Sequence, residues 1–236
     1  MSDAKEYGQP LRDAYYADDR TWIYHGDCRE VLAELGADQD VSVTLLAYPL
    51  ALVFDPPYGI AYESGARRVE GNARSIANDD DLAVRDAVLE WWNCRGPALV
   101  FGSWRRPKPA GTKGVLVWDK GGALGMGDLS LPWKFDHEEV YVLGGGFEGR
   151  RDCGSVLRHP PEQSMGRLHP HQKPVGLLSM LLDKLPGEAL VIDPCMGVGS
   201  TLVAAKARGH RAIGIEADER YCEIAARRLA QEVLAL

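Results

Sequence analysis

Short apolar runs alternate with longer amphipathic stretches along most of the chain. The runs are rich in Val, Ile, Leu and aromatic residues, which is typical of strands. They predict strands at 21–25, 51–54, 98–101, 115–118, 139–143, 189–192 and 212–216. Helical spacing of the apolar positions, with Gly or Pro at the ends, predicts helices at 28–35, 81–94, 174–185, 200–208 and 218–234. Residues 1–20 are polar and predict an arm draped over the surface.

The alternation is clearest near the C-terminal end of the sequence. The continuous apolar strand 189–192 leads through a loop at 193–199 into a helix, a strand and a last helix. Strands that alternate with helices predict a parallel sheet covered by helices. We therefore expect an α/β fold with a single doubly wound, Rossmann-like sheet, in one domain over residues 1–236.

The apolar run 51–54 ends on Asp55-Pro56-Pro57-Tyr58. Neither proline has a backbone N–H, so a sheet ladder cannot continue through them, and each favours extended geometry in the residue before it. The sequence thus predicts a stiff elbow that carries one carboxylate and one aromatic ring. In open α/β sheets, ligands bind outside the carboxyl ends of the strands. A plain turn remains an alternative interpretation, because Asp and Pro are common turn formers.

A second candidate site follows the strand 189–192. Gly197 and Gly199 allow the backbone to approach a ligand closely, and the next helix begins with free N–H groups. Glu216 ends the following strand and can accept from the two hydroxyls of a ribose. A nicotinamide dinucleotide site is disfavoured because position 202 is Leu where a third glycine is needed. A phosphate-binding P-loop is an even weaker interpretation, because the residue directly before Ser200 is not the lysine that this motif requires.

Composition is that of an ordinary globular protein, with 45% hydrophobic and 26% charged residues. The five cysteines form no C-x-x-C pair, so we expect no disulfide framework and no metal site, and a reducing cytoplasm fits. The net charge of −7 resides in residues 1–57, which hold 11 acids and 4 bases; the remainder holds 23 of each. A local basic face can therefore still bind phosphates.

Three motifs together resemble one enzyme family. Asp55-Pro56-Pro57-Tyr58 resembles the catalytic motif of the DNA amino-methyltransferases, which move a methyl group from S-adenosylmethionine to adenine N6 or cytosine N4. The segment 193–201 resembles their cofactor loop, and 169–174 resembles the segment that precedes this loop. Having the catalytic motif first is the circularly permuted, β-class order. The resemblance spans roughly residues 21 to 233.

The resemblance implies a set of site residues and partners. The catalytic residues would be Asp55, Pro56, Pro57 and Tyr58. The residues around S-adenosylmethionine would be Asp27, Cys28, His169, Lys173, Asp193, Pro194, Cys195, Gly197, Gly199, Thr201, Glu216 and Ala217, with Lys173 near the methionine carboxylate. Asp27 is equally well explained as a helix N-cap. Double-stranded DNA would be the partner, and a homodimer is compatible with the family.

Cys195 follows a proline, as the nucleophile of cytosine carbon-5 methyltransferases does. The amino-methyltransferases usually carry an aromatic residue at this place in the loop. Because Asp55 and Tyr58 already supply a complete alternative site, we interpret Cys195 as a small buried side chain.

DNA contacts are expected from basic residues near the catalytic motif. Residues 59–80 form a polar loop that could close over a target base, with Arg67 and Arg68 on it. Residues 103–168 lie where the family keeps its target-recognition region, and Arg105, Arg106 and Lys108 open that segment. Any single arginine here is about equally well explained as a solvated loop charge.

The reaction that the resemblance implies is direct attack by an exocyclic amine of the base on the methyl group of S-adenosylmethionine. The Asp55 carboxylate and the Pro56 carbonyl can accept hydrogen bonds from this amine, and Tyr58 can stack on a flipped base. Asp55 favours adenine N6, because related cytosine N4 enzymes tend to carry Ser there. Cytosine N4 remains the alternative, followed by a protein or RNA methyltransferase and by a non-catalytic nucleic-acid-binding protein.

Overall fold

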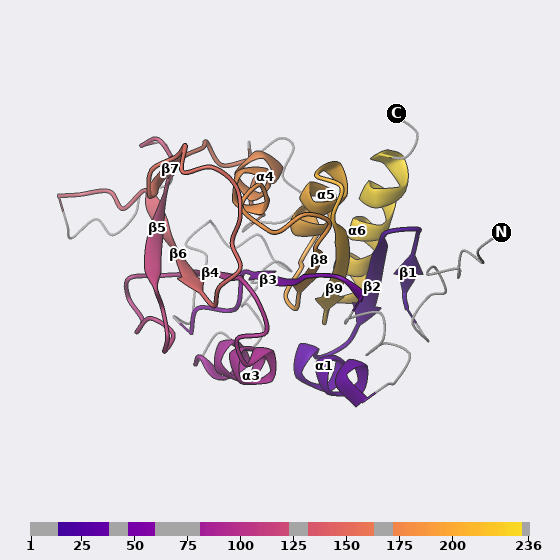
Figure 1. Ribbon diagram of the computed structural model, residues 1–236. Helices are drawn as coiled ribbons and strands as arrows, with labels where there is room; N and C mark the ends of the chain where they lie inside the picture. The colour runs from indigo at the N-terminus through magenta and orange to yellow at the C-terminus, as the bar shows by residue number, and fades with distance from the viewer. Residues whose placement is uncertain (1–13, 38–46, 60–80, 123–131, 163–171, 233–236) are drawn as a thin grey trace, which may run out of the picture.

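A computed structural model describes residues 14–37, 47–59, 81–122, 132–162 and 172–232 (Figure 1). Within these ranges one large sheet forms the middle of the molecule, and helices cover both of its faces. None of the helices in the described ranges is long and apolar enough to cross a membrane.

The sheet has nine strands in the order β1-β2-β9-β8-β3-β4-β6-β5-β7. The strands are β1 (Tyr16–Ala17), β2 (Thr21–His25), β3 (Leu50–Phe54), β4 (Ala98–Gly102), β5 (Gly114–Asp119), β6 (His137–Leu143), β7 (Val156–Arg158), β8 (Leu190–Asp193) and β9 (Arg211–Glu216). The run from β2 through β9, β8 and β3 to β4 is parallel. Beyond it, β6 is antiparallel to both β4 and β5, and β7 is parallel to β5.

Two helical layers enclose the sheet (Figure 1). The helices α4 (Val175–Leu182), α5 (Ser200–Ala207) and α6 (Glu219–Glu232) cover one face, and α1 (Cys28–Ala37) and α3 (Ala83–Trp92) cover the other. Side chains alternate along each strand, so Val53 packs under the first layer while Leu52 and Phe54 pack under the second. Both faces are apolar, which explains why the parallel strands read as continuous hydrophobic runs.

Strands from distant parts of the sequence lie beside one another. Leu52 of β3 pairs with Ile192 of β8, and His25 of β2 pairs with Glu216 of β9. The carboxyl ends of these parallel strands therefore meet at one edge of the sheet. The segments after β3 and β8, which hold the motif at residues 55–58 and the glycine loop, begin next to each other.

The expected doubly wound, Rossmann-like α/β sheet is confirmed. Each predicted strand and helix is present, with ends shifted by a few residues. Two short strands were not predicted. β1 pairs antiparallel with β2 inside the segment expected to be a loose arm, and β7 pairs with β5 inside the middle region.

Candidate functional site at the carboxyl edge of the sheet

The functional candidates from four neighbouring strands line up along the carboxyl edge of the sheet. In sheet order they are Asp27 after β2, Glu216 at the end of β9, Asp193 at the end of β8 and Asp55 after β3. These four acids come from opposite ends of the sequence. The fold thus brings together the two candidate sites that the sequence could only propose separately.

The loop after β8 is shaped by glycines. Gly197 and Gly199 have φ of 53° and 76°, a region that side-chain-bearing residues rarely adopt. A Cβ on Gly199 would lie 2.8 Å from the Ala225 Cβ, whereas a Cβ on Gly197 would meet no atom within 4 Å. Gly199 is therefore required by helix packing, and Gly197 faces space in which a ligand can approach the backbone.

Glu216 holds this loop in place. Its Oε2 accepts from the Gly197 N–H at 2.9 Å, and its Oε1 accepts from the Asp218 N–H at 2.9 Å. Burial raises the pKa of the Glu216 carboxyl, although hydrogen bonds from the N–H groups of Asp218, Gly197 and Ala217 act in the opposite direction. A carboxylate offers about four lone-pair sites, so with these three N–H donors bound Glu216 can still accept from a ligand hydroxyl.

Asp193 is buried beneath the loop, with 3% of its surface exposed. It accepts hydrogen bonds from the Thr201 hydroxyl and, at 3.1 Å, from the Cys195 N–H. Burial outweighs these bonds and raises the Asp193 pKa to about 7. Asp193 and Thr201 therefore tie the loop to the start of α5 from below.

Asp27 and Cys28 flank the same loop from β2. The Asp27 Oδ1 accepts from the Arg29 N–H at 2.9 Å, which is the expected N-cap bond of α1. The thiols of Cys28 and Cys195 are neighbours. The Cys28 thiol and burial raise the pKa of Cys195 well above its usual value, so the Cys195 thiol is a poor nucleophile. The backbone carbonyl of Ala217 contacts the His25 ring nitrogen at 3.1 Å.

The motif at residues 55–58 forms the predicted elbow after β3. Pro56 is buried, while Asp55, Pro57 and Tyr58 are half-buried. The Tyr58 hydroxyl lies 2.7 Å from the Asp55 Oδ1 and 3.0 Å from the Glu138 Oε2. Its single proton can serve one carboxylate at a time. Burial and the two neighbouring carboxylates raise the pKa of Tyr58 well above its usual value.

A chain of alternating charges surrounds the motif. The Lys173 ammonium lies 2.5 Å from the Asp55 Oδ2 and 3.1 Å from the Glu138 Oε2, and the Lys120 ammonium lies 2.5 Å from the Glu138 Oε1. Burial disfavours the charged form of both Lys173 and Glu138. Their opposite charges outweigh it, so the pKa of Lys173 is raised and that of Glu138 falls to about 2.

Lys173 was expected near the methionine end of the cofactor. In this structure its ammonium contacts the Asp55 carboxylate, and it also lies 5.0 Å from the centre of the Phe101 ring. Glu138 and Lys120 were not among the expected site residues. Two weak signals marked them: Glu138 lies in the polar start of β6, just before its apolar part, and Lys120 directly follows the end of β5.

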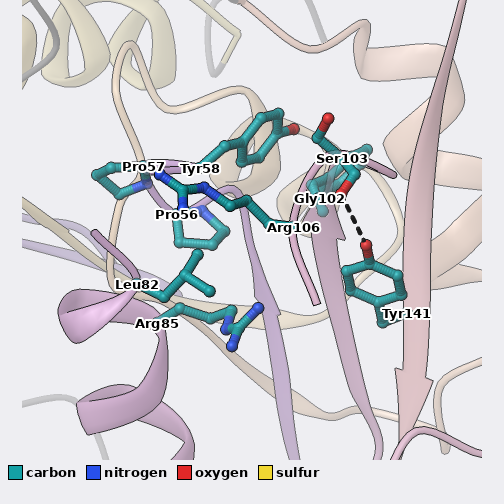
Figure 2. Close-up of a pocket in the computed structure, with 10 residues that line it drawn as sticks. Pro56, Pro57, Tyr58, Leu82, Arg85, Gly102, Ser103, Arg106 and Tyr141 are labelled. Atoms are coloured by element: carbon teal, nitrogen blue, oxygen red, sulfur yellow. Dashed lines mark hydrogen bonds between the residues drawn. The ribbon is translucent and has the colours of Figure 1, made fainter. Parts of the chain in front are cut away.

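A small hollow adjoins the catalytic motif. Pro56, Pro57 and Tyr58 form one wall, and Ser103 and Arg106, which follow β4, form another. Figure 2 shows these side chains converging, with Leu82 and Arg85 of the α3 segment beneath them. The hydroxyl of Tyr141 lies 3.3 Å from the Ser103 carbonyl oxygen and 2.7 Å from the Glu139 Oε2, and its single proton can serve one of these acceptors at a time.

Arg105 and Lys108 are exposed near this hollow, and Arg106 is half-buried. Arg67, Arg68 and His169 lie outside the described residues. In the part of the chain that the structure describes, no three His, Cys, Asp or Glu side chains are arranged to hold a metal ion.

Comparison with known proteins gives consistent matches. A family model for DNA methylases of the N6/N4 class matches residues 132–227. YubD of Escherichia coli strain K12, named as a methylase, is 29% identical over 225 residues, covering 87% of this chain and 88% of its own. The M1.HpyAVI–SAM crystal structure has a TM-score of 0.64 at 21% identity, covering 88% of this chain and 99% of that one. The cytosine-N4-specific PvuII DNA methyltransferase has a TM-score of 0.62 at 15% identity, covering 90% and 87%. Both solved structures share the fold described above.

Proposed function

We propose that this chain, which is similar to DNA methylases of the N6/N4 class, methylates adenine N6 in DNA with S-adenosylmethionine as the methyl donor. One observation carries the proposal. The Asp55 carboxylate and the glycine loop 193–199 emerge from adjacent parallel strands, β3 and β8. An amine held by Asp55 would therefore lie beside a ligand held by the loop.

The residues of the loop fit S-adenosylmethionine. Gly197 opens the backbone to a ligand, and Glu216 keeps acceptor capacity for a ribose hydroxyl beside its three N–H donors. Asp27 and Cys28 lie one strand further along, on the side where the family resemblance puts the adenine. When bound, the cofactor supplies an electrophilic methyl group on a sulfonium. Asp193 and Thr201 act indirectly, because they hold the loop rather than face its open side.

Asp55 is suited to bind the target amine. Lys173 already occupies its Oδ2, and Tyr58 occupies its Oδ1. We infer that the amine replaces the Tyr58 hydroxyl at Oδ1. The hydroxyl then retains Glu138 as its acceptor, and the Tyr58 ring is left to stack on the flipped base. Lys173 keeps Asp55 oriented throughout, which is the positioning that this reaction requires.

A carboxylate at position 55 favours adenine N6 over cytosine N4. It is the residue that the family resemblance associates with adenine, whereas Ser is usual in cytosine N4 enzymes. Cytosine N4 is the second candidate, because its exocyclic amine could use the same acceptor. The fold is no guide here, since the solved PvuII enzyme has the same fold and is cytosine-N4-specific.

The test is analysis of the modified base. Purified protein is incubated with DNA and S-adenosylmethionine, the DNA is digested to nucleosides, and the product is identified by mass and retention. We expect N6-methyladenine. Recovery of N4-methylcytosine alone would overturn the adenine assignment but keep the amino-methyltransferase function.

Two variants complete the test. Asp55→Ala should abolish methylation while calorimetric affinity for the cofactor persists. Asp152→Ala is the matched control, because Asp152 is an exposed acid that follows β6 and pairs with Lys184, and it should leave activity unchanged.

A further inference from the structure

Two large aromatic side chains are exposed beside the hollow and contact each other. Trp104 is 50% exposed and Phe135 is 45% exposed, with ring centroids 5.2 Å apart. The ring of His137 lies 6.5 Å from that of Phe135, and the Arg105 guanidinium lies 5.5 Å from the centre of the Trp104 ring. We call Trp104 and Phe135 the aromatic platform. Clustered exposed aromatics on a protein surface usually mark a binding surface.

The platform lies at the same edge of the sheet as the catalytic motif. Trp104 comes two residues after β4, and Asp55 comes directly after the neighbouring parallel strand β3. The pairing of Gly102 with Glu139 brings the segment before β6 alongside the segment after β4. Ser103, the residue before Trp104, lines the hollow beside Pro56 and Tyr58 (Figure 2). The platform therefore continues from the hollow at the catalytic motif.

The charge around the platform is positive. The segments 103–108 and 132–137 that carry the two rings contain Arg105, Arg106, Lys108 and Lys134, against a single acid, Asp136. Arg105 and Lys108 are exposed, as is Lys134. Exposed aromatic faces interleaved with basic side chains are suited to a polyanion that carries flat rings, which is the chemistry of single-stranded nucleic acid.

We propose that the aromatic platform stacks on an unpaired base next to the target nucleotide, while the surrounding basic side chains contact its phosphates. This inference rests on the proposed function, because flipping the target base leaves its neighbours without a stacking partner on one side. A ring on Trp104 or Phe135 replaces that partner. The platform thus belongs to the strand-binding part of the region 103–168.

The experiment measures binding to a fluorescently labelled single-stranded oligonucleotide by anisotropy, without cofactor. The Trp104→Ala/Phe135→Ala double variant should bind roughly 10- to 100-fold more weakly, the range expected for loss of stacking with a base. Its dependence on salt concentration should be unchanged, because the phosphate contacts remain. Trp104→Phe should retain most of the affinity, since a flat ring is kept.

Tyr15→Ala is the matched control. Tyr15 is 39% exposed and stacks edge-on against His25, near β1 at the far edge of the sheet, so its loss should leave oligonucleotide affinity unchanged. Cofactor affinity, measured on each variant, reports whether the fold is intact.

Three results would overturn the proposal. The first is unchanged affinity in a folded double variant. The second is an equal loss in Trp104→Phe. The third is a double variant that binds the oligonucleotide normally but changes from dimer to monomer in size-exclusion chromatography, which would identify the platform as a contact between copies. Failure of the proposed function is distinguishable, because it shows as absence of methylated base from wild-type protein whatever the oligonucleotide data say.

Discussion

Replacing Lys173 with methionine should destabilise the protein in a pH-dependent way. The change removes the ammonium that lies between Asp55 and Glu138 but keeps a side chain of similar length. Lys173 is 9% exposed, and the two carboxylates are 25% and 19% exposed. Removing one partner from a buried ion pair typically costs 3–5 kcal/mol. We expect about 3 kcal/mol at pH 8, the lower end, because Lys120 still pairs with Glu138.

The pH dependence follows from the two carboxylates that remain. Without the ammonium, Asp55 and Glu138 repel each other, so the folded variant binds a proton more firmly than the unfolded chain does. Stability of the variant is therefore lost as pH rises through this raised pKa. The free-energy difference from wild type should be smaller at pH 5 than at pH 8, and adding Glu138→Gln to the variant should recover part of it.

Urea unfolding followed by circular dichroism at both pH values measures the effect. Lys184→Met is the matched control: Lys184 and Asp152 also lie 2.5 Å apart, but the Asp152 side chain is 60% exposed, so the loss should be small at either pH. Equal stability of wild type and Lys173→Met at pH 8, or a loss that does not vary with pH, would refute the account of Lys173 as the charge that balances this site.

The remaining predictions concern the cofactor loop. Glu216→Ala should weaken S-adenosylmethionine binding by roughly 1.5–3 kcal/mol, as for a hydrogen bond to a charged group, and unchanged calorimetric affinity would remove Glu216 from the site. Gly199→Ala should lower the free energy of unfolding by more than the cost of left-handed backbone strain, which is about 1–2 kcal/mol, because the new Cβ also clashes with Ala225. Gly197→Ala introduces the strain without a clash, so its free energy of unfolding should fall less. Burial holds the Asp193 pKa at about 7 in the folded state, against 3.8 as its usual value, so this acid lowers stability as pH rises from about 4 to 7. Asp193→Asn should flatten that trend, and identical urea midpoints for both proteins across this range would contradict it.

Much of this fold could be predicted because buried parallel strands leave a strong signal. A strand covered on both faces is apolar throughout, as at 51–54 and 189–192, and it stands out from its surroundings. β1 and β7 leave no such signal. β1 has two residues, and β7 has three, of which only Leu157 is buried. Their pairing depends on the neighbouring strand rather than on their own composition.

The parts of the candidate site that depend on local backbone geometry were predictable from the sequence. The proline elbow after Asp55 and the glycines of the loop act through their own backbone geometry, so their residue types carry the information. The charges of Lys120 and Glu138 carry no such local meaning. They become part of the site only because β5 and β6 fold back beside β4 and bring them to Lys173. Sequence reasoning therefore found the motif and Lys173 but missed Lys120 and Glu138.

The pairing of early strands with late ones has a consequence for synthesis of the chain. β2 and β3 lie near the start of the sequence, yet β9 and β8, which pair with them, are among the last strands to be made. Until then a nascent chain presents unpaired strand edges, which are prone to aggregate. Contacts of such high sequence separation also form slowly, and the Lys173–Asp55 ion pair joins residues 118 positions apart. The loop 193–199 directly follows β8, so it is synthesised together with the strands that complete the sheet. A nascent chain could therefore bind the methyl donor only after this core has been synthesised.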